Sequence, residues 1–243
     1  WKQECLLQEY LPKLSRYIVL SDYDKRDYKE KLDIDTEVKI NPRSFVSEQK
    51  CDPSQKKFFM ATRFVYAKGL DLMMESFEEF CKQDSEWQLD IIGSGDLMKE
   101  IMADAKKRNL LDRVNFVGYT NEPEKYYLNS SVFLLPSRWE GWPMVIMEAF
   151  EFGLPVIAFH TGAMDLIIDD GKTGFLPEAF DTHKFTEAML KLAHDEDLRR
   201  QMSANAIVKS ADFNIDKAVD AWNDLFKRVT AKKKGEANEN QRN

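Results

Sequence analysis

The stretch that most constrains the fold runs from residue 132 to residue 159 and predicts a strand, a loop, a helix and a second strand. Residues 132–135 form an apolar run with the length of a buried strand. Pro143 suits the first position of the helix, because its φ is fixed and its missing N–H is not needed there. Gly153 is placed to end that helix. Two buried strands joined by a helix indicate a parallel sheet.

Two glutamates bracket the predicted helix start, with Glu140 in the loop before it and Glu148 inside it. The first N–H groups of a helix are unpaired and partly positive, so this end can hold a phosphate. Side chains lean back toward the N-terminus, and Glu148 can reach a group about 8 Å behind it at a rise of ~1.5 Å per residue. A bound nucleoside diphosphate would place its ribose near Glu148. An ordinary crossover helix with two exposed glutamates explains the pattern equally well.

The glutamates belong to a longer pattern over residues 136–158, P-S-x-x-E-G-x-P-x-x-x-x-E-A-x-x-x-G-x-P-V-I-A. It resembles the E-x7-E motif of the retaining glycosyltransferases of family four, which have the two-domain GT-B fold. The resemblance implies that Glu148 binds the ribose hydroxyls of a nucleotide and that Glu140 lies beside the donor sugar and its phosphate. Neighbouring positions implied to line the donor site are Gly141, Trp142, Pro143, Met144 and Val145. For Trp142, simple burial is the other interpretation.

A second group of candidate ligands follows the predicted strand 58–61. Arg63 and Lys68 lie at its carboxyl end, where ligands of open α/β sheets bind. A guanidinium fork and a point cation suit a diphosphate, although a surface loop with solvated charges is the alternative. The pattern R-F-x-x-x-K-G is similar to the diphosphate-binding Arg and Lys of the same family. The resemblance therefore implies that Arg63, Lys68 and Glu140 are the catalytic residues, the two cations neutralising the departing diphosphate.

Two more strand ends carry candidate ligands. Gly95 closes a G-x-G turn after the predicted strand 87–92, and Tyr119 follows the predicted strand 114–117. A lone G-x-G is a weak indication, and the third glycine of a dinucleotide fingerprint is absent. In position the turn is similar to the family's G-x-G-x-L turn, which implies contact between Gly95 and the nucleotide. Tyr119 is predicted either to stack on the nucleobase or to pack on the following helix.

Composition limits the partners. The chain has 243 residues, 43% of them hydrophobic, enough for one sizeable core and extra elements. The net charge of −7 argues against nucleic acid as the main partner. Three widely spaced cysteines, Cys5, Cys51 and Cys81, indicate reduced thiols in a cytoplasmic protein. Neither a signal peptide nor an apolar run of about 20 residues is present.

Residues 1–42 are predicted to be a remnant of another domain. A helix is expected near residues 6–14, a strand over 17–20, a helix capped by Ser21 and running to residue 32, and a strand over 38–40. This order is similar to the last elements of the family's acceptor domain. We therefore expect most of that N-terminal domain to lie outside this sequence.

The rest of the chain is predicted to hold a linker over residues 43–57 and an α/β domain over 58–212. The domain is expected to be Rossmann-like, with helices on both faces of a parallel sheet, as in the C-terminal half of a GT-B fold. Residues 213–230 are predicted as a crossover helix and 231–243 as a disordered tail. The lysine run of that tail is compatible with peripheral contact to an anionic inner-membrane surface. Hydrophobic residues recur at helical spacing over residues 70–82, which predicts a helix whose methionines belong to the core.

The resemblance favours a hexosyltransferase that acts with retention on a nucleotide diphosphate sugar, preferably a UDP-sugar. A glycan or lipid-linked acceptor, as in polysaccharide biosynthesis, would bind through the N-terminal domain, so this chain alone is expected to transfer little. No cofactor and no metal ion are expected, because cations and a helix dipole can stabilise the leaving group. A non-catalytic nucleotide-sugar-binding module is the alternative, and a UDP-sugar epimerase fits less well. The absent third glycine disfavours an NAD oxidoreductase.

Overall fold

The computed structural model describes Tyr10 and residues 14–240, with side chains up to residue 231. The chain divides into two compact units. The terminal unit comprises Trp1–Pro42 and Phe213–Asn243, and the sheet unit comprises Arg43–Asp212. The helix predicted near residues 6–14 falls almost entirely outside the described residues.

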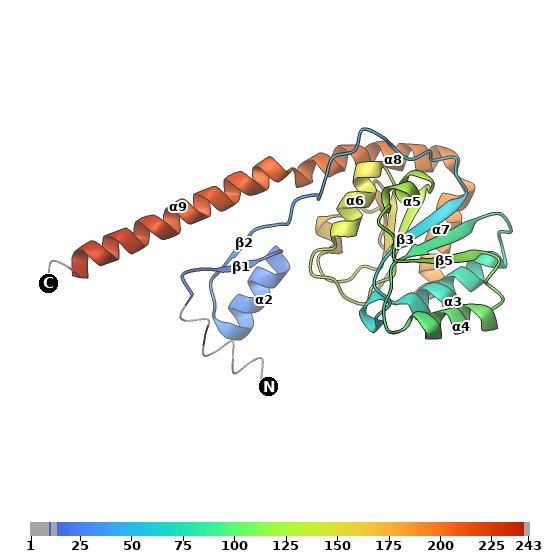
Figure 1. The fold of residues 1–243 in the computed structure, drawn as a ribbon, viewed down its shortest axis with the longest axis horizontal. Coiled ribbons are helices and arrows are strands. Elements are labelled where there is room, and N and C mark those ends of the chain that lie inside the picture. Colours follow the sequence, from blue (N-terminus) through green and yellow to red (C-terminus); the bar gives the residue numbers. More distant parts are fainter. Residues whose placement is uncertain (1–9, 11–13, 241–243) are drawn as a thin grey trace. The chain divides into compact units, whose positions relative to one another are not determined.

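The sheet unit contains a six-stranded, fully parallel sheet (Figure 1). Its strands are β3 (Lys57–Ala61), β4 (Gln88–Ile92), β5 (Val114–Gly118), β6 (Val132–Leu135), β7 (Val156–Ala158) and β8 (Gly174–Phe175). The order across the sheet is β5-β4-β3-β6-β7-β8, so the chain first builds outward from β3 and then crosses back to its other side. The predicted α/β fold with a parallel sheet is confirmed.

Helices cover both faces of this sheet. They are α3 (Leu70–Cys81), α4 (Met98–Lys107), α5 (Glu124–Leu128), α6 (Met144–Phe152), α7 (Thr182–His194) and α8 (Glu196–Ser210), with the short 3-10 turns η2 (Tyr66–Lys68), η3 (Met164–Leu166) and η4 (Ala211–Phe213). Neighbouring residues of β3 show the two layers, because side chains alternate along a strand. Phe58 packs on Phe80 of α3 at 5.2 Å, whereas Phe59 packs on Tyr127 of α5 at 4.8 Å.

The apolar strands are buried on both faces, as expected for a parallel sheet enclosed by helices. All residues of β6 are buried, and so are Phe58, Phe59 and Met60 of β3. On α3, Met73 and Met74 are fully buried, which confirms the predicted core role of its methionines. Each such side chain contributes about 1.5–3 kcal/mol through burial. The core therefore keeps the ends of the strands, from which the loops emerge, in fixed positions.

The terminal unit contains a small parallel pair of strands, β1 (Tyr17–Val19) and β2 (Thr36–Val38), joined by α2 (Asp22–Leu32). Ser21 caps α2 by accepting a hydrogen bond from the Asp24 backbone N–H, as predicted. The second strand lies two residues earlier than the predicted 38–40, because pairing with the short β1 aligns Tyr17 with Thr36. The long helix α9 (Ile215–Asn240) completes the unit.

Three further predictions differ from the structure. α9 continues to Asn240, so residues 231–240 are helical rather than a disordered tail; their Ala, Lys and Glu residues are good helix formers. Pro143 is the cap of α6, not its first helical residue, because its ψ of 99° is extended. Residues 43–57, predicted as a linker, belong to the sheet unit. Buried Glu151 of α6 ties them down, through Arg43 and Lys50.

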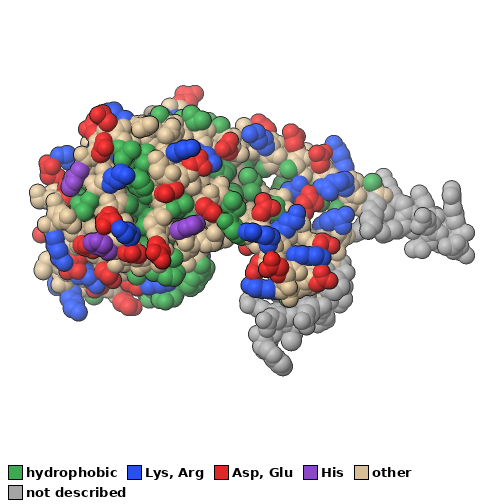
Figure 2. All heavy atoms as spheres, turned by 180° about the vertical axis from the view of Figure 1, so that it is seen from behind, with side chains coloured by type: hydrophobic (Ala, Val, Ile, Leu, Met, Phe, Trp, Pro, Cys, Tyr) green, Lys and Arg blue, Asp and Glu red, His purple; other side chains and the backbone are tan. Residues whose placement is uncertain are grey.

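The surface has a mixed charge pattern. On the face drawn in Figure 2, acidic and basic side chains are interspersed and do not gather into a patch of one sign. Among the described residues, no helix is both long and apolar enough to cross a membrane.

Candidate functional site

A cavity of about 450 Å³ opens at the carboxyl edge of the sheet. Ala61, Ile92 and Leu135 are the last residues of β3, β4 and β6, and all three line it. Between β3 and β6 the order of strands reverses. In open α/β sheets the loops diverge at such a switch point and leave a crevice in which ligands bind. Topology alone therefore places this cavity where a ligand site is expected.

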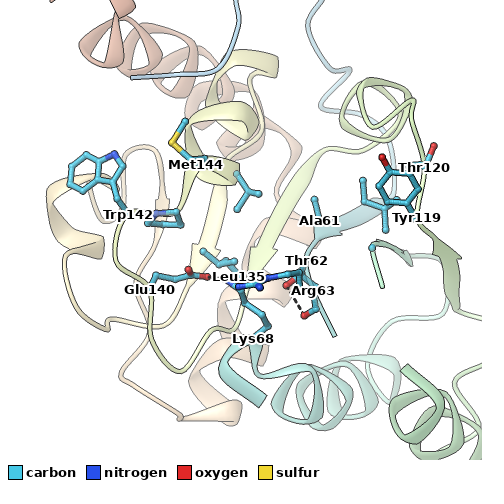
Figure 3. A pocket seen from close by; sticks show the side chains of 14 residues that line it. Ala61, Thr62, Arg63, Lys68, Tyr119, Thr120, Leu135, Glu140, Trp142 and Met144 are labelled. Carbon is cyan, nitrogen blue, oxygen red and sulfur yellow. Dashed lines mark hydrogen bonds and ion pairs between the residues drawn. The ribbon is translucent and has the colours of Figure 1, made fainter. Parts of the chain in front are cut away.

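The cavity brings together most of the residues predicted from the sequence. Those that line it are Arg63, Lys68, Tyr119, Glu140, Trp142, Pro143, Met144 and Val145. In Figure 3 Arg63, Lys68 and Glu140 converge, with Trp142 on one flank and Tyr119 on the opposite flank. Gly93, the first glycine of the predicted G-x-G turn, also lines the cavity. Sequence reasoning missed Thr62 and Thr120, which line it too. Their adjacency to predicted positions was the only available signal.

An ion pair between Lys68 and Glu140 lies in the cavity. The Lys68 Nζ donates to Glu140 Oε1 at 2.6 Å, and the Ser137 hydroxyl donates to the same oxygen at 2.7 Å. The two charged side chains are only 18% and 10% exposed. Hydrogen bonds between ionised groups are about twice as strong as neutral ones. An anion that binds to Lys68 must therefore share this ammonium with Glu140 or displace the carboxylate.

Arg63 is the second cation of the cavity and differs from Lys68 in its environment. It is exposed, and its guanidinium makes no hydrogen bond or ion pair with any residue that the structure describes. A planar guanidinium can bind two oxygens of one phosphate. Arg63 thus offers its full set of donors to an anion in the cavity.

Two loops, one after β3 and one after β6, are locked together behind these charges. Gly69 has φ +62°, and a Cβ at this position would lie 2.0 Å from the Pro136 carbonyl oxygen. The Arg138 guanidinium donates to Asp71 at 2.8 and 2.6 Å and stacks over the Tyr66 ring at 4.0 Å. Hydrogen bonding from Arg138 lowers the pKa of Asp71. This packing sets the spacing between Lys68 and Glu140.

The start of α6 forms another wall. Met144 and Val145, its first two residues, line the cavity. Backbone N–H groups in the first turn of a helix lack partners within the helix and carry partial positive charge. The positive end of the α6 dipole therefore adds to the positive charges of Lys68 and Arg63 in the cavity.

Three predicted residues do not line the cavity. Glu148 lies four residues beyond Met144, one turn further along the same side of α6. Gly141 lies between two lining residues. Gly95 packs closely against the backbone of Phe64, because a Cβ at position 95 would lie 2.6 Å from the Phe64 carbonyl oxygen.

Glu148 is held by two hydroxyl groups that the sequence did not reveal. Its Oε2 accepts a hydrogen bond from the Tyr127 hydroxyl at 2.9 Å, and its Oε1 accepts one from the Ser44 hydroxyl at 3.2 Å. Both donors come from segments far from Glu148 in the sequence, so only the folded chain brings them together. Among the described residues, no group of three or more His, Cys, Asp and Glu side chains is arranged to hold a metal ion.

The sheet and its cavity define the class of protein. The fold is that of GT-B glycosyltransferases: a Staphylococcus aureus TarM mutant in complex with fondaparinux, alpha-GlcNAc-glycerol and UDP has a TM-score of 0.85 and 24% identity. This similarity covers 93% of the present chain and 46% of that one. The model of the family described as glycosyl transferases group 1 matches residues 44–209. The chain belongs to this family.

Curated relatives agree with this family. An uncharacterised glycosyltransferase of Haemophilus influenzae is 28% identical over 214 residues, which are 87% of this chain and 61% of the relative. The amylovoran biosynthesis glycosyltransferase AmsD of Erwinia amylovora is 31% identical over 174 residues, 71% of this chain and 48% of AmsD. The chain therefore spans about half to three-fifths of the length of these relatives.

Proposed function

We propose that the chain is the donor-binding half of a retaining glycosyltransferase. It transfers a sugar from a nucleotide diphosphate sugar, with a UDP-sugar favoured, to a glycan or lipid-linked acceptor. One observation carries the proposal: Arg63, Lys68 and the start of α6 line the same cavity, and this cavity lies at the switch point of the sheet. Membership of the glycosyl transferases group 1 family supports it, and so does the UDP in the complex with the TarM mutant.

The cavity is suited to stabilising a diphosphate leaving group. When the bond between the sugar and the diphosphate breaks, negative charge grows on the phosphate oxygen that leaves. Lys68, which is paired with Glu140, and the N–H groups at the start of α6 are held in place before the reaction, so they need little reorganisation to meet this charge; exposed Arg63 lies beside them in the cavity lining. Removing one such donor from comparable sites costs about 10²–10³ in rate. We assign the diphosphate to these three groups.

Glu140 and Glu148 would act on opposite sides of the diphosphate. Glu140 lines the cavity beside Lys68, where it can orient the donor sugar. Glu148 lies one helical turn away and would accept hydrogen bonds from the ribose hydroxyls. The acceptor would be bound by the part of the two-domain architecture that these 243 residues do not cover. We also propose that the protein is cytoplasmic and contacts the membrane peripherally.

Calorimetry with nucleotides tests donor binding. We expect UDP to bind more tightly than UMP, because only the diphosphate can engage both cations. Lys68→Met and Arg63→Met should each weaken UDP binding about tenfold, a common effect of losing one charge-assisted hydrogen bond. Lys56→Met is the matched control, since Lys56 forms an exposed ion pair with Glu86 away from the cavity. If the wild type and all three variants bound UDP with equal affinity, the proposal would be contradicted.

Catalysis and its stereochemistry need a separate experiment. A thermal-shift panel of UDP-, GDP- and ADP-sugars selects the donor, because a ligand that binds the folded state raises the melting temperature. Slow donor hydrolysis with the anomeric configuration retained, followed by proton NMR, is expected for an enzyme. Binding without any hydrolysis, also in a chain extended to the length of its relatives, would favour the non-catalytic binding module.

A further inference from the structure

Tyr127 of α5 is a fully packed tyrosine with one polar contact. Its ring stacks on Phe133 and on Phe152, with ring centres 5.9 and 4.9 Å apart. It also makes an edge-to-face contact with Phe59, with ring centres 4.8 Å apart. The residue is 1% exposed. Such packing leaves the ring one orientation, so its hydroxyl group also has a fixed position.

That hydroxyl group is aimed at Glu148. Tyr127 donates to Glu148 Oε2 at 2.9 Å, a good hydrogen-bond distance. Burial, followed by the nearby Glu148 charge, raises the pKa of Tyr127 well above its ordinary value, so the phenol keeps its proton and remains a donor. A buried hydroxyl without a partner is destabilising, which favours the conformation of Glu148 that satisfies it.

The other carboxylate oxygen faces the exposed side of the helix. Glu148 Oε1 accepts a hydrogen bond from Ser44 at 3.2 Å, in a part-open environment. This contact is longer than the one from Tyr127, and it marks the direction from which a hydroxyl donor reaches the carboxylate. A glutamate side chain loses rotamer entropy when it is ordered. Holding one oxygen in advance removes much of that cost from the binding step.

We infer that Tyr127 is a positioning residue for Glu148: it fixes one carboxylate oxygen so that the carboxylate accepts both hydroxyl groups of a nucleotide ribose. The inference rests on the proposed function, in which Glu148 meets the ribose. It adds a specificity determinant outside the cavity lining, contributed by a different helix. The predicted consequence is a preference for ribonucleotides over nucleotides that lack the 2′ and 3′ hydroxyls, and this preference depends on the phenol.

The test compares UDP with 2′,3′-dideoxy-UDP by calorimetry on the 243-residue chain. GDP and its dideoxy counterpart replace them if the wild type binds GDP more tightly. Tyr127→Phe removes one hydroxyl and keeps the ring. We expect it to weaken UDP binding about tenfold, as for loss of support to a charged hydrogen-bonding group, and to leave binding of the dideoxy nucleotide unchanged. Adding Tyr127→Phe to Glu148→Gln should cause no further loss.

Tyr126→Phe is the matched control. Tyr126 precedes Tyr127 on α5 and stacks on Phe59 at 6.0 Å, but its hydroxyl makes no hydrogen bond within the described part of the chain. Its UDP affinity and its preference for UDP over the dideoxy nucleotide should match the wild type. A purely structural role of Tyr127 would lower affinity for both nucleotides equally, and that result would overturn the inference.

The remaining outcomes separate this inference from the proposed function. If Glu148→Gln loses the preference while Tyr127→Phe keeps it, only the inference fails. If the wild type binds neither nucleotide, or binds UDP and dideoxy-UDP equally, the proposed ribose role fails and the inference with it. Should Tyr127→Phe not fold, Glu148→Asp serves instead, because its shorter side chain cannot keep the contact with Tyr127. Full retention of the preference in Glu148→Asp would overturn the inference.

Discussion

At the scale of single residues, the ion pair of Lys68 and Glu140 is the central feature of the cavity. Both side chains are mostly buried and 2.6 Å apart, so each largely compensates the charge of the other. This pairing lowers the cost of holding a lysine in a partly enclosed site before a ligand arrives. In the proposed function, a diphosphate would therefore compete with the Glu140 carboxylate for Lys68.

Glu140→Gln should therefore strengthen nucleoside diphosphate binding. The neutral amide no longer competes for Lys68 and no longer repels the phosphates, and we expect UDP to bind about three- to tenfold more tightly, or roughly 1 kcal/mol. Calorimetry measures the change. Glu100→Gln, on the exposed side of α4, is the control and should leave the affinity unaltered. Weaker binding by Glu140→Gln would show that Glu140 assists the diphosphate rather than competes with it.

A second cluster of charges lies around Glu151, one turn of α6 beyond Glu148. This carboxylate is 2% exposed and accepts hydrogen bonds from Arg43, Lys50 and the Ser47 backbone N–H. Burial alone would raise the pKa of Glu151, but its hydrogen bonds with Lys50 and Ser47 and the charges of Lys50 and Arg43 outweigh burial and lower it. The cluster thus ties residues 43–50 to the helix that carries Glu148.

Glu151→Gln should destabilise the protein by about 2 kcal/mol at pH 7, because it breaks a buried pair whose cations keep some access to water. A lowered pKa in the folded state means that the contribution is present above the ordinary glutamate pKa of about 4.3 and is lost as pH falls below it. The gap between wild type and variant, measured by urea unfolding, should shrink below about pH 4. A constant gap from pH 7 to pH 3 would contradict this account.

At the scale of elements, the loops after β3 and β6 function as one structure. Sequence reasoning selected both loops because each carries charged residues in a motif and follows an apolar strand. It could not show that Gly69 touches the Pro136 carbonyl or that Arg138 pairs with Asp71. These contacts join residues about 70 positions apart, and no local pattern specifies them.

Gly69→Ala tests this packing. We expect a loss of about 3 kcal/mol or more, because the methyl group meets a backbone oxygen and φ is positive. Gly171→Ala is the matched control: its φ is +72° and a Cβ there meets nothing within 4 Å, so only about 1 kcal/mol of strain is expected. Thermal unfolding should show melting temperatures lower by about 2–4 °C per kcal/mol. Equal effects of the two changes would contradict the proposed contact.

The central motif shows what local patterns predict well. The apolar run 132–135 is β6, and Gly153 ends α6 with φ +82° as its position suggested. The cap role of Pro143 was missed by one residue, because the helix start depends on ψ, which proline does not fix.

At the scale of the whole molecule, the sheet unit has its own complete core. The main cluster of buried hydrophobic residues runs from Phe58 to Met202, entirely within residues 43–212. A separate core is the usual condition for independent folding. Among the described residues, those that line the cavity all belong to this unit.

Residues 43–212 should therefore fold alone and bind UDP as the 243-residue chain does. Circular dichroism should show a single cooperative thermal transition, and calorimetry should give UDP affinities that agree within about threefold. Lys68→Met in the shorter chain serves as the control for specific binding. A shorter chain that folds cooperatively but no longer binds UDP would show that the terminal unit contributes to the donor site.

The amino-acid sequence by itself determined the parallel α/β class and singled out the loops that carry Arg63, Lys68 and Glu140, because buried strands, helix ends and motif spacing are local patterns. Only the tertiary structure decided that the strand order reverses between β3 and β6, that Lys68 and Glu140 form an ion pair, and that Tyr127 holds Glu148. Those features depend on contacts between distant segments, which arise when the sheet assembles and its helices close over it.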